Sequence, residues 1–138
     1  GSNQDVTSGS ALRLTWGTEH FDVGGLHTGS SSTIVVVDPG FYLLIGQVEW
    51  ANLVGATGTN TPYTTTIHKN NSGTFEIAET IGIVGITNIG LKQSVSGMDM
   101  AVVGDYYDLV VTQLSGTTQT VTCTAGRLNT QFLAVKLF

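Results

Sequence analysis

The segment Gly40–Asn52, GFYLLIGQVEWAN, restricts the possible fold more than any other part of the chain. Side chains of a strand point alternately to its two faces, and an antiparallel sheet usually exposes one face to water. Both faces of this expected strand nevertheless begin apolar. One face carries Tyr42, Leu44, Val48 and Trp50, and the other begins Phe41, Leu43, Ile45.

The segments 106–114 and 129–138 have the same property, so three expected strands carry apolar side chains on two faces. One face of each strand can pack against a partner sheet, but the other would expose a large apolar patch. A covering helix is not available in the sequence, and a closed barrel would still leave its outer face wet. We therefore expect self-association, with an interface formed by Phe41, Leu43, Ile45, Tyr106, Asp108, Val110, Leu133, Val135 and Phe138.

The rest of the chain also favours strands. Charged residues make up only 11% of the chain, against about a quarter in ordinary domains, and 21 Thr and 10 Ser supply the polar surface. We expect eight or nine strands in a sandwich or barrel. Their expected ranges are 11–16, 32–38, 40–52, 63–70, 74–84, 92–102, 106–114, 118–125 and 129–138.

The domain organisation is expected to be simple. Gly1-Ser2 has the form of a cloning remnant, and residues 1–10 are expected to be a flexible stub before a single domain over 11–138. Cys123 is the only cysteine, so no intrachain disulfide can form, and a small buried apolar side chain is expected rather than a catalytic thiol.

Charge and motifs argue against several functions. The net charge is −5 with only five Lys and Arg, so no basic patch for nucleic acid can form. No apolar run approaches the length of a membrane span. The chain contains no nucleophile elbow, P-loop or dinucleotide fingerprint, and no catalytic residue or cofactor is expected.

Possible metal ligands are poorly spaced. His20 and His27 lie seven positions apart, which is not a tight metal motif, and His68 is expected at a surface or interface. A cluster of three His68 side chains on a threefold axis remains an alternative. Asp105 follows Gly104 at a corner, where it is expected to accept hydrogen bonds from backbone N–H groups rather than to bind calcium. No metal site is therefore expected.

Ligand recognition is expected in the loops 53–62 and 85–97, because β-sandwiches present loops on a rigid scaffold. Tyr63 follows a Thr/Asn/Pro segment and is the expected surface aromatic. The candidate binding residues are Thr59, Asn60, Tyr63 and Asn88.

Four segments together resemble the globular domain of the complement component 1q and tumour necrosis factor superfamily. They are GFYL at 40–43, IHKNNSG at 67–73, SVSGMDMAVVGDYYDLVV at 94–111 and TQFLAVKLF at 130–138. The resemblance covers about residues 20–138 and implies an all-β, two-sheet antiparallel jelly roll that packs as a homotrimer. It further implies that segments 40–50, 105–113 and 130–138 share the inner sheet.

The Thr- and Ser-rich, Cys-poor pattern, with GGLHTG and TQLSGT, is most similar to the phage and bacterial versions of this family. The resemblance then implies a structural or adhesion module at a virion surface, as a fibre tip, head fibre or capsid decoration. Its partners would be two further copies of itself and a host-surface glycan or protein, or capsid or tail proteins. A bacterial extracellular or spore-surface protein is the alternative, and a glycan-processing or metal enzyme is a third hypothesis.

Overall fold

The computed structural model describes residues 2–17, 31–51, 53, 60–71, 76–85, 90–123 and 129–138, and these residues form strands and turns without any helix. The strands are β1 (Gln4–Val6), β2 (Leu12–Arg13), β3 (Thr33–Val35), β4 (Gly40–Trp50), β5 (Thr61–Lys69), β6 (Glu76–Val84), β7 (Leu91–Ala101), β8 (Tyr106–Gln113), β9 (Gln119–Val121) and β10 (Gln131–Lys136).

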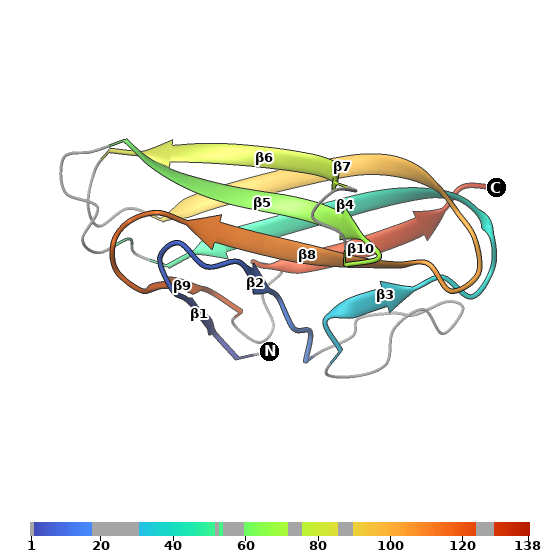
Figure 1. Cartoon of the computed structure of the whole chain (residues 1–138), viewed down its shortest axis with the longest axis horizontal. Helices are drawn as coiled ribbons and strands as arrows, with labels where there is room; N and C mark the ends of the chain where they lie inside the picture. The colour runs from blue at the N-terminus through green and yellow to red at the C-terminus, as the bar shows by residue number, and fades with distance from the viewer. Residues whose placement is uncertain are drawn as a thin grey trace.

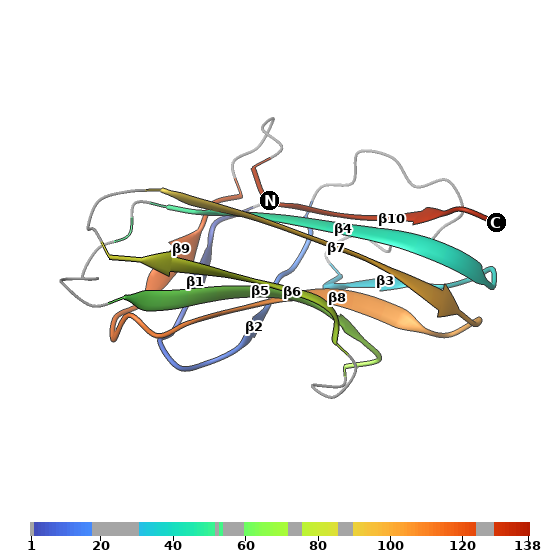
Figure 2. The same cartoon turned by 90° about the horizontal axis from the view of Figure 1, so that it is seen from above.

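Two antiparallel sheets of five strands pack face to face, as Figures 1 and 2 show. In the β4 sheet, β4 lies between β7 and β10, and β9 joins it to β1. In the β8 sheet, β8 pairs with β2, β3 and β5, and β6 extends the sheet beyond β5. The expected all-β sandwich is confirmed. None of the described residues forms a helix that could cross a membrane.

Two expectations about the sheets are wrong. The segment 106–113 was expected in the same sheet as 40–50 and 131–136, but β8 is the centre of the opposite sheet. Apolar side chains on both faces indicate that burial of both faces of the strand is favourable. They do not indicate to which sheet the strand belongs. In addition, Gln4–Val6 of the expected N-terminal stub pairs with β9, so this part of the stub is a strand.

The core lies between the sheets and consists of the residues that alternate inward along each strand. On β4 these are Tyr42, Leu44, Val48 and Trp50, all at most 1% exposed. Trp50 meets Tyr63 of β5 in an edge-to-face contact with ring centroids 5.0 Å apart. The Trp50 indole reaches across to Gln93 of β7, which is also buried.

At Gly46 of β4 a side chain from the opposite sheet packs directly against the backbone. A Cβ at this position would lie 2.5 Å from Cδ1 of Leu109 on β8 and 3.0 Å from Val95. These distances are shorter than carbon atoms tolerate, so the side chain of Leu109 occupies the space that any larger residue at position 46 would need.

Candidate assembly surface

The outward face of β4 is apolar along the first half of the strand. Phe41, Leu43 and Ile45 are half-buried and point away from the core. On the β7 side, Leu43 pairs with Met98 and Phe41 pairs with Met100. Paired residues of an antiparallel sheet share a face, so both methionines extend the apolar surface formed by β4.

The other neighbour of β4 continues this surface. Leu133 and Val135 of β10 pair with Ile45 and Leu43, and Phe138 stacks on Phe41 with ring centroids 5.4 Å apart. The exposed fractions are 60% for Met98, 61% for Met100 and 78% for Phe138. We call this surface the apolar patch; it consists of Phe41, Leu43, Ile45, Met98, Met100, Leu133, Val135 and Phe138.

Polar side chains occupy the second half of the same face. Gln131 donates a hydrogen bond from Nε2 to Oε1 of Gln47 at 3.2 Å, and Lys92 lies 3.6 Å from Glu49. The outer face of the β4 sheet is therefore divided across its strands into an apolar half and a polar half. The sequence carries the same change, since Gln47 and Glu49 follow Ile45 on this face of β4.

Of the nine residues expected in an interface, six lie in the apolar patch and three do not. Tyr106, Asp108 and Val110 belong to β8 and lie in the opposite sheet. Asp108 is fully buried, with Oδ2 2.6 Å from Nε of Arg13 and Oδ1 3.9 Å from Nδ1 of His68. Burial raises the pKa of Asp108, while the charges of Arg13 and His68 act to lower it. Asp108 therefore shares no sheet face with Phe41, which lies in the opposite sheet.

The expected recognition residues have mixed outcomes. Tyr63 is fully buried against Trp50, so its expected role as a surface contact is wrong. Asn60 is exposed beside β5, whereas Thr59, Asn88, His20 and His27 lie outside the described residues. Residues 91–97 of the second expected loop belong to β7.

Asp105 has the role that the sequence predicts for it. Its Oδ2 accepts a hydrogen bond from the backbone N–H of Val102 at 3.0 Å, and the preceding Gly104 has a φ of +91° that favours glycine. In the part of the chain that the structure describes, no three His, Cys, Asp or Glu side chains form a group that could hold a metal ion.

Sequence reasoning missed Met98 and Met100 as members of the surface. The signal was present, since they alternate with Asp99 in SGMDMAV and must share one face of a strand. Both side chains point away from the core on β7, which pairs with β4 and with no other strand that the structure describes.

No model of a protein family matches the chain, and no curated protein is similar to it in sequence. Among solved structures, the chain is similar to the globular domain of zebrafish complement 1qA protein, with a TM-score of 0.56 and 8% identity. The alignment covers 100% of this chain and 98% of that domain. At this level of identity the likeness concerns the fold, and the chain has the two-sheet jelly-roll fold of a complement 1q globular domain.

Proposed function

We propose that the chain forms a homotrimer through the apolar patch and serves as a non-enzymatic structural or adhesion module outside the cell, at the surface of a phage particle. The patch is the observation that supports assembly. Burying one large apolar side chain contributes roughly 1.5–3 kcal/mol, so covering eight partly exposed ones supplies on the order of 10 kcal/mol before the costs of association.

The number of copies and the setting have separate support. The jelly-roll fold, and the sequence resemblance to a superfamily of trimeric domains, favour three copies. The likeness of GGLHTG and TQLSGT to phage versions of the domain favours a virion surface. Under this proposal the loops at the ends of the sandwich and the exposed outer face of β6 stay available to a host glycan or protein, or to capsid or tail proteins.

Mass measurement tests the assembly directly. Sedimentation equilibrium of the purified chain should give three times the 14.5 kDa chain mass. Leu43→Glu places a charge in the apolar patch and should give a folded single chain. Ile81→Glu is the matched control, because Ile81 is 58% exposed on β6 of the opposite sheet, and it should leave the trimer intact.

Two results would contradict the proposal. One is a wild-type chain that remains a single folded copy at all concentrations; the other is dissociation by Ile81→Glu but not by Leu43→Glu. The adhesion role has its own test, in which the labelled trimer is applied to bacterial cells and to immobilised cell-surface glycans. Absence of binding to both would leave only a structural role in the particle.

A further inference from the structure

A cluster of charged side chains joins the two sheets behind one end of the apolar patch. Lys69 at the end of β5 places Nζ 2.7 Å from Oδ2 of Asp99 on β7 and 2.9 Å from Oδ2 of Asp105. Lys69 also donates to the carbonyl oxygen of Met100 at 3.2 Å. One ammonium group therefore contacts a strand of the β4 sheet and the corner that leads into β8.

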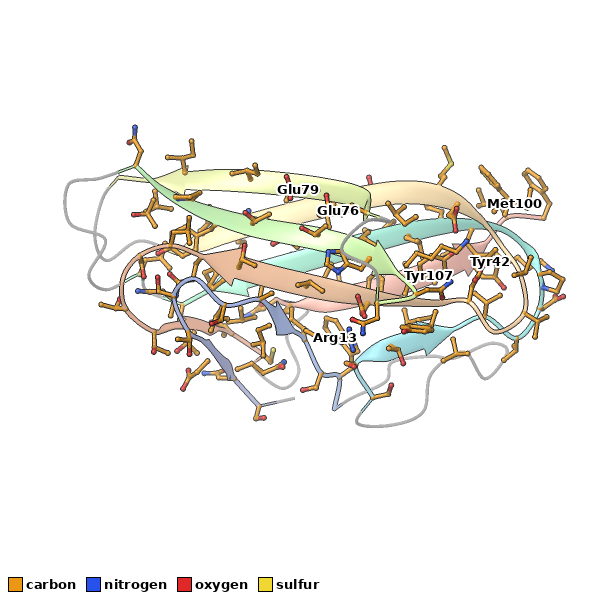
Figure 3. All side chains as sticks on the ribbon, in the orientation of Figure 1. Arg13, Tyr42, Glu76, Glu79, Met100 and Tyr107 are labelled. Carbon is orange, nitrogen blue, oxygen red and sulfur yellow. The ribbon has the colours of Figure 1, made fainter. Side chains whose placement is uncertain are left out.

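The partners of Lys69 are themselves held by further hydrogen bonds. Tyr107 of β8 donates its hydroxyl to Oδ2 of Asp99 at 2.6 Å. Asn70 donates from Nδ2 to Oδ1 of Asp105 at 2.8 Å. Figure 3 shows Tyr107 beside Tyr42 toward the end of the sandwich that also carries Met100. The side chains of Lys69, Asp99 and Asp105 are 18%, 21% and 11% exposed, so solvent screens their interaction only in part.

The cluster lies beside a cleft of about 430 Å³ that is lined by Lys69, Asn70, Ile77, Asp99, Met100, Val102 and Asp105. Among the described strands β7 pairs only with β4, and across the sandwich it packs at Gly97 against Ile77 of β6. Side chains alternate along a strand, so the direction in which Asp99 points determines the direction of Met98 and Met100. Asp99 points inward to Lys69 and Tyr107, and both methionines point outward beside Leu43 and Phe41.

We infer that Lys69, Asp99 and Asp105 form an ionic latch, with Lys69 as a positioning residue that holds the end of β7 so that Met98 and Met100 complete the assembly surface. The inference rests on the proposed homotrimer. It assigns Lys69 to assembly although its side chain lies on the inner side of the sheet. Removing the ammonium leaves two carboxylates, Asp99 and Asp105, that repel each other beside the cleft, and the last residues of β7 lose the ion pair that joins them to β5.

The methionines provide a specific readout, because Met98 and Met100 are the only two in the chain. Labelling the methionine methyl groups with ¹³C therefore gives two assignable NMR signals from the end of β7. In Lys69→Leu, both signals should shift or split, and trimer association should weaken by roughly tenfold or more. Lys69→Arg keeps the charge and should restore most of the association.

The matched control is Lys92→Leu, which removes the same charge from the other end of β7. The Lys92 side chain is 63% exposed, and its Nζ lies 3.6 Å from Oε2 of Glu49, so this surface ion pair contributes little. Neither the methyl signals nor the association constant should therefore change appreciably in Lys92→Leu. Asp99→Asn is the milder second variant if Lys69→Leu does not fold, because Lys69 then keeps Asp105 as its ionic partner.

The possible outcomes are separable. Unchanged methyl signals in Lys69→Leu overturn the latch, whatever the association constant. Shifted signals with unchanged association overturn its role in assembly. A wild-type chain that is a single copy removes the proposed trimer, and the methyl signals of that single copy then still decide whether Lys69 positions β7.

Discussion

Trp50 on β4 donates a hydrogen bond from its indole Nε1 to Oε1 of Gln93 on β7 at 2.8 Å, inside the core of the sandwich. The same Oε1 accepts from the Thr65 hydroxyl of β5 at 3.0 Å, and Gln93 Nε2 donates to the carbonyl of Tyr63 at 2.8 Å. One buried amide thus connects three strands and both sheets.

We expect Gln93→Leu to lower the free energy of unfolding by about 3 kcal/mol, because three buried polar groups lose their partner without water to replace it. Urea unfolding followed by tryptophan fluorescence measures the loss. Gln131→Leu is the control, since Gln131 lies on the outer face of the sheet, where its side chain is hydrogen-bonded to Gln47; this change should cost less than about 1 kcal/mol. Equal losses in the two variants would show that the buried amide has no special role.

Gly46→Ala should destabilise the protein by about 2 kcal/mol through overpacking, because the new methyl group would meet Cδ1 of Leu109 at 2.5 Å. Gly90→Ala provides the comparison: its Cβ would lie 3.6 Å from the carbonyl oxygen of Trp50, an ordinary contact. Thermal unfolding of both variants should therefore show a lowered midpoint for position 46 only. A Gly46→Ala protein as stable as wild type would mean that the sheets can separate locally at little cost.

Acid should weaken the protein through Asp105. Burial acts to raise the pKa of this carboxyl, but hydrogen bonds from Asn70, the Val102 N–H and Lys69 outweigh it and lower the pKa from 3.8 to about 2. A lowered pKa in the folded state stabilises the protein above the unfolded value, and this contribution is lost as pH falls from about 4 to about 2.

The expected contribution is about 2 kcal/mol, read as the difference between wild type and Asp105→Asn in urea titrations at pH 5 and pH 2. Asp108 titrates in both proteins, so the difference isolates Asp105. The difference in free energy of unfolding between wild type and Asp105→Asn should become smaller as the pH approaches 2. A difference that stays constant across this range contradicts the assigned hydrogen bonds.

Alkali should weaken the protein through Tyr107. Burial is the main cause that raises the pKa of this phenol above 10.0, and the hydrogen bond to Asp99 and the nearby carboxylates raise it further. Its stabilising contribution is therefore complete below pH 10 and is lost as pH rises, because the unfolded chain ionises first. Between pH 9 and 11, wild type should lose stability more steeply than Tyr107→Phe; parallel curves would disprove this.

Local patterns in the sequence predicted the strands and one of their corners. Alternation located β4 and its two unlike faces, and Gly104-Asp105 predicted the corner before β8. Asn70 and Asn71 follow β5 in a turn, and both have a φ of +55°, which asparagine tolerates better than most residues.

Contacts between distant segments could not be predicted in the same way. Period-two spacing gives the faces of β8 but not its sheet, and nothing near Asp108 in the sequence indicates that Arg13 and His68 surround it. Tyr63 was expected at the surface because its burial depends on contact with Trp50, which lies on another strand. The latch combines positions 69, 99 and 105, which only the packing of the two sheets brings together.

The close approach of Leu109 to Gly46 has a consequence for cargo. Because Leu109 packs directly on the backbone of Gly46, no channel runs between the sheets at this position. A small molecule could therefore not pass here along the interior of the sandwich. A domain built in this way does not carry small molecules through its middle as a hollow barrel does. We therefore expect this protein to recognise its binding partners at the outer surface of the sandwich.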